Sequence, residues 1–170
     1  MANICEISME VRGDHSNIEA FFNALTQEDD VWMGRGADAE IDYDDEGHTA
    51  TISGWCKWSV QSSLIDDALS MRKQKESKEG FWYQAEIDKV NEFLTLFEAC
   101  QKYNVNMEVY SSEPGMEFQE HAKYENGHIV NEATNYVETF NEDTQEWESH
   151  GGYLWDFDVS DPDTNLQVNA

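Results

Sequence analysis

The spacing of the apolar residues changes along this chain, and the order of these changes constrains the fold more than any other feature. Residues 3–11 alternate apolar and polar side chains, which is typical of a strand with one buried face. Over residues 18–25 the apolar side chains recur at three- and four-residue steps, which is typical of an amphipathic helix. A chain of 170 residues is long enough for one domain with its own core. The sequence therefore predicts a mixed α and β domain that opens with a strand and a helix.

The middle of the chain predicts a loop, a pair of strands and a further helix. Residues 28–36 have the composition of a loop. Residues 39–58 favour two strands around a turn at Asp44–Gly47, where glycine tolerates a positive φ. A helix is expected from about Val60, with basic residues late in the segment, where they suit a helix C-terminus.

The second half of the chain predicts one more helix and then strands. Ile87, Val90 and Phe97 belong to an apolar series at three- and four-residue steps, so we predict a helix over residues 84–104. The "ENG" at 125–127 is a strong hairpin signal. Strands are expected over residues 105–112, 116–124, 128–140 and 146–157.

These elements combine into one predicted architecture. A largely antiparallel sheet with helices on one face is an α+β sandwich of two layers. The last strands would add a C-terminal β-hairpin, and the other sheet face would be left to solvent or to a partner. We predict a single domain over residues 1–158 and an acidic flexible tail over residues 159–170.

Short patches of the sequence resemble one family. "NICEISMEVRGD" with "IEAFFNAL" is similar to the opening strand and helix of the YubB-type ferredoxin-like domain proteins. "GWCKWS" resembles that family's Trp-Gly-Thr-Lys-Trp-Asp signature and keeps Trp55, Lys57 and Trp58, although Cys56 replaces Gly-Thr and Ser59 replaces Asp. "SEPGMEF" and "KYENG" are similar to its Glu-Pro-Gly-x-x-Phe and Tyr-x-x-Gly pair. The resemblance implies a ferredoxin-like split β-α-β core and a plasmid or phage context, but no established chemistry.

The charge of the chain is extreme. It has 36 Asp and Glu against 10 Lys and Arg, a formal net charge of −26. Direct binding to nucleic acid or to an anionic membrane is not expected, because both need cationic groups. Six Trp, seven Tyr and eight Phe give too much apolar surface for a disordered acidic chain, and they fit halophilic adaptation poorly. A basic partner is therefore expected.

The remaining sequence predicts a cytoplasmic protein without a cofactor. Cys5, Cys56 and Cys100 lack a zinc-binding spacing and are expected to be buried free thiols in a reducing compartment. The first residues lack the basic and apolar regions of a signal peptide, and no apolar run reaches the roughly 20 residues that span a bilayer. The sequence has no P-loop, GxSxG or HExxH motif, so neither catalysis nor a cofactor nor a metal is predicted.

Residues 38–46 hold six carboxylates and no Lys or Arg. The run partly fits a calcium loop, but Ser53 stands where the bidentate Glu belongs. A solvated hairpin is one interpretation. A phosphate-mimicking surface is the other, because same-face residues of a strand repeat at about 6.6–6.8 Å, a spacing similar to that of phosphates along a nucleic-acid strand. The absence of Lys and Arg from Tyr124 to Ala170 favours mimicry. Repulsion among the crowded carboxylates is expected to raise their pKa values.

We therefore predict a phage- or plasmid-type anti-defence inhibitor, which mimics nucleic acid in the basic groove of a host protein such as a CRISPR effector or restriction enzyme. Two alternatives stay open: an accessory protein-binding module that is acidic only for solubility, and a hydrolase of unknown substrate.

Of Trp55 and Trp58, one is expected to pack into the core. The predicted partner-binding residues are Asp29, Asp30, Asp38, Glu40, Asp42, Tyr43, Asp44, Asp45, Glu46, Glu142, Asp143, Glu146 and Glu148.

Overall fold

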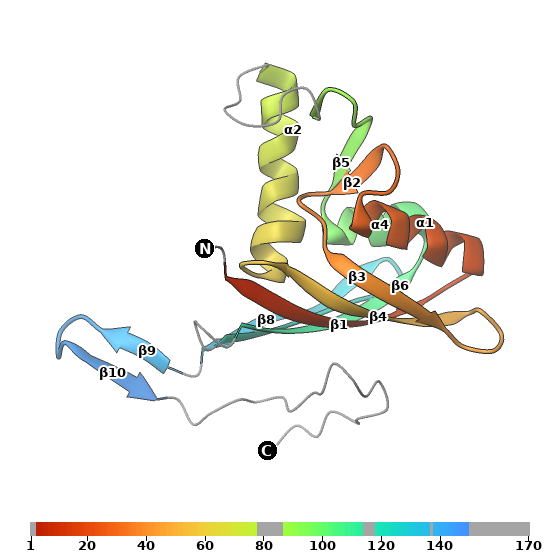
Figure 1. Ribbon diagram of the computed structural model, residues 1–170. Coiled ribbons are helices and arrows are strands. Elements are labelled where there is room, and N and C mark those ends of the chain that lie inside the picture. Colours follow the sequence, from red (N-terminus) through yellow and green to blue (C-terminus); the bar gives the residue numbers. More distant parts are fainter. Residues whose placement is uncertain (1–2, 78–86, 114–117, 137, 150–170) are drawn as a thin grey trace.

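A computed structural model of the chain describes residues 3–77, 87–113, 118–136 and 138–149. At its centre, antiparallel strands form one six-stranded sheet in the order β3-β4-β1-β6-β7-β8, and the helices cover one face of it (Figure 1). The strands of this sheet are β1 (Ile4–Arg12), β3 (Asp38–Tyr43), β4 (Thr49–Lys57), β6 (Asn106–Glu113), β7 (Phe118–Glu125) and β8 (His128–Tyr136). The predicted α+β fold, with a largely antiparallel sheet and a layer of helices, is confirmed.

The core lies between the sheet and the helices. On β1 the side chains of Ile7, Met9 and Val11 are buried, as their alternation predicts. Helix α1 (His15–Thr26) contributes Phe21 and Leu25 to the same core, and both are fully buried. The helical spacing in this segment therefore predicted the face that packs against the sheet.

The helix predicted from about Val60 is present as two continuous parts. A π-helical segment, η1 (Gln61–Asp66), leads directly into α2 (Asp67–Ser77). Arg72 of α2 donates from Nη2 to the Glu98 carboxylate at 2.6 Å and to the Phe93 carbonyl at 2.7 Å. The hydrogen bonds from Arg72 hold the pKa of Glu98 below its usual value, although partial burial opposes this. Arg72 thereby ties α2 to helix α4 (Leu96–Tyr103).

The helix predicted over residues 84–104 is wrong for much of that range. In the described part, strand β5 (Glu92–Leu94) precedes α4. Thr95 caps α4: its hydroxyl accepts the Glu98 N–H, and the Glu98 carboxylate accepts the Thr95 N–H at 2.8 Å. Phe97 of the predicted series does lie in α4 and packs against the main core, but the earlier apolar residues fill a small second core instead. This core contains Ile87, Val90 and Phe93, packed with Trp32 and Met71.

The loop predicted over residues 28–36 contains a short strand. β2 (Val31–Met33) pairs in parallel with β5 and forms a separate two-stranded sheet within the helical layer (Figure 1). Just before it, the Asp30 carbonyl accepts the Asn91 N–H at 2.6 Å. Three residues are too few to show a period of two, and the partner strand is distant in the sequence, so the residue pattern did not indicate this pairing.

Both predicted glycine turns are confirmed. Gly47 has a φ of 72° in the β3–β4 turn. Asn126 and Gly127 have φ values of 52° and 84° and join β7 to β8 as a two-residue hairpin turn.

The C-terminal strands depart from the prediction in their boundaries. The strand predicted over residues 128–140 divides into β8 and β9 (Glu138–Asn141). β9 pairs with β10 (Glu146–Ser149) as a hairpin that projects away from the main sheet (Figure 1). The tail predicted over residues 159–170 lies outside the described residues, so this tail and the single domain over residues 1–158 stay predictions.

The three cysteines are buried free thiols, as predicted. Cys5 and Cys56 oppose each other across β1 and β4. Among the described helices, none is both long and apolar enough to cross a membrane.

Candidate functional site: the open face of the sheet

The sheet face opposite the helices carries three rows of polar side chains, and we call this surface the open face. Residues paired directly across antiparallel strands point to the same face. The register therefore gives the composition of each row. The rows are Asp38–Trp55–Glu6–Ser112–Gln119, Glu40–Ser53–Ser8–Tyr110–His121 and Asp42–Thr51–Glu10–Glu108–Lys123.

The part of the open face on β3, β4 and β1 is strongly acidic. It comprises the exposed carboxylates Asp38, Glu40, Asp42, Glu6 and Glu10, and we call it the acidic half. Those on β3 repeat at about 6.6–6.8 Å, and β3 is separated from β1 by two strand spacings, or about 9.5 Å. Trp55, Ser53 and Thr51 of β4 lie between the two lines of charge.

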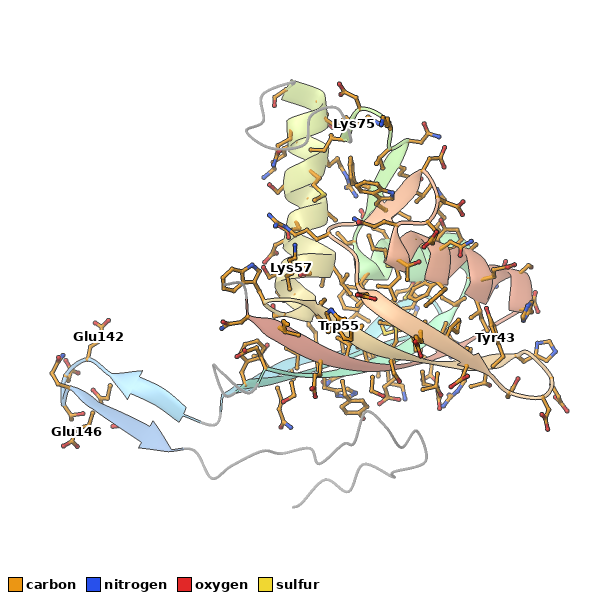
Figure 2. All side chains as sticks on the ribbon, in the orientation of Figure 1. Tyr43, Trp55, Lys57, Lys75, Glu142 and Glu146 are labelled. Carbon is orange, nitrogen blue, oxygen red and sulfur yellow. The ribbon has the colours of Figure 1, made fainter. Side chains whose placement is uncertain are left out.

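Two basic side chains lie at the border of the acidic half. Arg12 ends β1 and pairs with Glu10. Lys57 ends β4, but its charge acts on Asp67 at the start of α2. Burial raises the pKa of Asp67, while Arg35, in a 2.5 Å ion pair, and Lys57 oppose that rise. Figure 2 shows Lys57 on the side of the sheet where α2 begins. Among the described residues, no Lys or Arg forms an ion pair with Asp38, Glu40 or Asp42.

The turn between β3 and β4 extends the acidic surface. Asp44, Asp45 and Glu46 are all exposed there. The Asp44 carboxylate accepts the His48 N–H at 2.9 Å. Slight desolvation raises the pKa of Asp44, but the backbone N–H groups of the turn outweigh it and lower the pKa. The expectation that crowding raises the pKa is therefore wrong for Asp44, because this carboxylate is a structural acceptor within its own turn.

Tyr43 lies on the other face of β3 from Asp42. Its ring contacts His15 of α1, with ring centroids 4.4 Å apart, and it packs against the main core. Burial, and to a smaller degree the charge of Glu19, raises the pKa of its hydroxyl. Alternation along the strand places Tyr43 away from the acidic half.

Asp29 and Asp30 belong to the helical layer. The Asp29 carboxylate accepts from the Asn23 side chain at 3.3 Å, and its carbonyl accepts the Trp32 indole N–H at 2.8 Å. Asp30 binds Asn91 through both backbone and side chain. These contacts fix the approach to β2, so the structure does not bring these two residues to the open face.

The predicted residues near the C-terminus lie on the β9–β10 hairpin. Glu142, Asp143, Glu146 and Glu148 are exposed. Figure 2 shows Glu142 and Glu146 at the opposite end of the molecule from Tyr43 and the β3–β4 turn. The predicted partner-binding residues therefore fall into separate places. Those on β3 and its turn belong to the acidic surface, except Tyr43, which faces the core. Those near the C-terminus lie on the distant β9–β10 hairpin, and Asp29 and Asp30 lie in the helical layer.

Residue patterns missed a polar cluster on β6, β7 and β8. His121 Nε2 lies 2.9 Å from Glu108 Oε1, and Asn131 Nδ2 lies 2.6 Å from His121 Nδ1. The Tyr110 hydroxyl donates to Glu108 at 3.0 Å, and Lys123 Nζ lies 3.2 Å from Glu108 Oε2. The rings of Tyr110 and His121 stack with centroids 4.3 Å apart. The register between β6 and β7 makes this cluster, and residue alternation alone does not give that register.

The negative charge of Glu108 is compensated by its partners within this cluster. Burial raises its pKa, but hydrogen bonds from His121, Tyr110 and Lys123 prevail, and the pKa of Glu108 lies below its usual value. The two ring nitrogens of His121 thus contact Glu108 on one side and Asn131 on the other. The acidic field of the open face is therefore concentrated on β3, β4 and β1.

The expectation that Trp55 or Trp58 packs into the core is wrong. Trp55 is 49% exposed and Trp58 is 46% exposed. Trp55 points to the open face because Cys56, its neighbour on β4, points into the core. Trp58 follows the end of β4 with a φ of 68°, so strand alternation no longer applies to it.

No group of three or more His, Cys, Asp or Glu side chains in the described ranges is arranged to hold a metal ion. The segment from Asp42 to Ser53, which partly fits a calcium loop, is strand, turn and strand.

Comparison with protein-family models, with curated proteins and with solved structures finds no match to this chain. The resemblance to the YubB-type family stays a prediction.

Proposed function

We propose that this protein is an inhibitor of phage or plasmid type that binds, through its acidic half, the basic nucleic-acid-binding groove of a host defence protein. The target class is a CRISPR effector or a restriction enzyme. Inhibition is competitive, because the bound acidic half occupies the place of the nucleic acid. Association is fast and weakens as salt is raised, because attraction between opposite charges steers the encounter.

One observation carries this proposal: Asp38, Glu40 and Asp42 stand at regular spacing along an exposed edge strand, with no ion pair to any residue that the structure describes. A second line of carboxylates, Glu6 and Glu10, runs beside them on β1. Solubility alone requires only that charge be spread over the surface. Regularly spaced negative charges on a sheet offer a groove built for phosphates a similar partner, because such a groove binds through its Lys and Arg.

We also infer a ferredoxin-like core within the sheet. The strand order β3-β4-β1-β6 supports it, together with α1 between β1 and β3 and the helices between β4 and β6. This is the sequence of elements of a split β-α-β fold. Such a core has no chemistry of its own, so the function rests on the surface.

A hydrolase is the second candidate, and the Glu108–His121 pair is the observation that favours it. A general base needs a substrate within hydrogen-bond reach. The described cavity beside Glu108 measures only about 10 Å³. A hollow of about 500 Å³ lies next to Arg12 and His48, but Asp14 is its one carboxylate among the described lining residues. A further hollow of about 800 Å³ holds Glu76, Glu92 and Glu98, of which Glu92 and Glu98 are ion-paired with Lys102 and Arg72. No described hollow gives the Glu108–His121 pair a space for a substrate, so the acidic half is the better-supported site.

A competition experiment tests the proposed function. The full chain is titrated onto a purified Cas9-type effector and a purified restriction endonuclease, each with and without its nucleic acid. We expect binding to the free protein and at least about a tenfold loss of affinity when nucleic acid fills the groove. Simultaneous binding with unchanged affinity would show that the groove is not the target.

A further inference from the structure

An exposed tryptophan lies between two carboxylates in the first row of the acidic half. Trp55 pairs with Asp38 of β3 on one side and with Glu6 of β1 on the other. About half of its surface is exposed, and Figure 2 labels it on the main sheet. A single exposed apolar side chain needs no explanation in itself. The charged groups on both sides of this indole make it a candidate contact.

The two carboxylates are uncommitted. In the part of the chain that the structure describes, neither Asp38 nor Glu6 forms an ion pair or a side-chain hydrogen bond. Glu10 and Glu108, by contrast, are paired with Arg12 and Lys123. The first row therefore has two carboxylates without a charged partner and one exposed aromatic ring. In the third row, by contrast, the carboxylates on β1 and β6 are paired with basic side chains.

We propose that Asp38, Trp55 and Glu6 form a site for one arginine side chain of the partner. This site rests on the proposed function, since the arginine would belong to the basic groove. A guanidinium within about 6 Å of the indole centroid gains from the negative face of the ring. Directly paired side chains have Cβ atoms about 4.5–5.5 Å apart, so the same guanidinium lies within reach of both carboxylates.

Arginine fits this site better than lysine does. Its guanidinium is planar, stacks on an aromatic ring and presents several N–H donors in fixed directions. An ammonium is a compact and strongly hydrated charge, so it loses more hydration on the indole and donates less well to two separated carboxylates. The chemistry of the row thus predicts a preference for arginine over lysine, which an acidic surface without the indole would not show.

Nona-arginine and nona-lysine peptides serve as probes, because both carry the same charge. Their dissociation constants are measured by fluorescence anisotropy at about 50 mM salt, where screening is weak. We expect the unmodified chain to bind nona-arginine more tightly. In Trp55→Ala the affinity for nona-arginine falls about two- to fivefold, and the arginine preference shrinks. Glu6→Gln, which keeps the side-chain size, is expected to reduce the same preference.

Trp58→Ala is the matched control, because Trp58 is exposed to a similar extent but lies outside the row. Its arginine preference should equal that of the unmodified chain. Equal binding of the two peptides, or an unchanged preference in Trp55→Ala, would overturn the arginine site while leaving the competitive function standing. Failure of both peptides to bind would overturn both the arginine site and the proposed function.

Discussion

The buried carboxylate of Glu120 fixes the start of the helix that follows β4. Glu120 is 7% exposed and lies on β7. It accepts the backbone N–H groups of Val60 at 2.7 Å and Gln61 at 3.1 Å, and the Ser111 hydroxyl at 2.6 Å. The first N–H groups of a helix lack partners within the helix, and a negative charge there is favourable. A side chain of the sheet therefore anchors the helical layer.

Replacing Glu120 tests this anchor. Glu120→Gln removes the charge and turns an amide NH₂ toward groups that are themselves donors, so we expect the free energy of unfolding to fall by about 2 kcal/mol. Urea denaturation measures the loss. The control is Glu132→Gln on the neighbouring strand β8, where the side chain is exposed and the change should stay within about 0.5 kcal/mol. Equal effects in the two variants would contradict the role given to Glu120.

At the scale of the element, Gly54 sets how closely β3 approaches β4. Gly54 pairs with Ala39. A Cβ on Gly54 would meet the Asp38 carbonyl oxygen and lie 2.6 Å from the Ala39 Cα. Both strands are needed for the first row of the open face, so this glycine also places Asp38 beside Trp55.

Gly54→Ala is expected to push β3 away from β4. Overpacking of this kind costs about 1–3 kcal/mol of the free energy of unfolding. The amide protons of β3 should also exchange faster with solvent in the variant. Hydrogen exchange read by mass spectrometry measures this, with Ser53→Ala as the control on the preceding residue. Unchanged protection of β3 in Gly54→Ala would show that the strand tolerates a side chain here.

The sequence predicted well those helices and turns whose residue pattern lies within one short segment of the chain. The α1 stripe and the two glycine turns each depend on neighbouring residues. The helix predicted over residues 84–104 failed because Ile87, Val90 and Phe93 pack against Trp32 and Met71 of other elements. One local signal did mark the true helix start. Thr95 and Glu98 have the spacing of a capping box, and that signal outranks apolar spacing at a helix boundary.

At the scale of the whole molecule, most of the described basic residues lie away from the acidic half, with Arg12 beside Glu10 as an exception. Several have partners in the helical layer: Arg35 with Asp67, Arg72 with Glu98, Lys102 with Glu92, and Lys75 with the carbonyls of Val90 and Asn91. Together with the pairing of Lys123 on β7, this distribution leaves the β3 side of the sheet without a neutralising layer. Segregation of charge, rather than net charge alone, gives the protein a directed field.

The candidate site could be predicted only in part from the sequence. The run over residues 38–46 indicated the acidic edge strand, because all its carboxylates are local. Glu6 and Trp55 were not associated with it, since β1 pairs with β4 across a long stretch of chain. The same run groups Tyr43 with Asp42, although successive residues of a strand face opposite sides of the sheet. The pairing of strands, and the sheet face to which each side chain points, are set when the sheet assembles. The pattern of charges along the sequence does not indicate them.

The most direct test of the account compares two triple variants of equal charge. One neutralises the acidic edge strand with Asp38→Asn, Glu40→Gln and Asp42→Asn. The other neutralises the β9–β10 turn and the start of β10 with Glu142→Gln, Asp143→Asn and Glu146→Gln. Each removes three negative charges and takes the formal net charge from −26 to −23.

The measurement is the dissociation constant of each variant for the effector or endonuclease that binds the unmodified chain, taken at low and at physiological salt. Three exposed charge pairs at about 0.5 kcal/mol each sum to about 1.5 kcal/mol, so the edge-strand variant should bind about tenfold more weakly. The hairpin variant should bind as the unmodified chain does. Equal weakening of both variants would contradict the account, because binding would then follow net charge and not the acidic half of the open face.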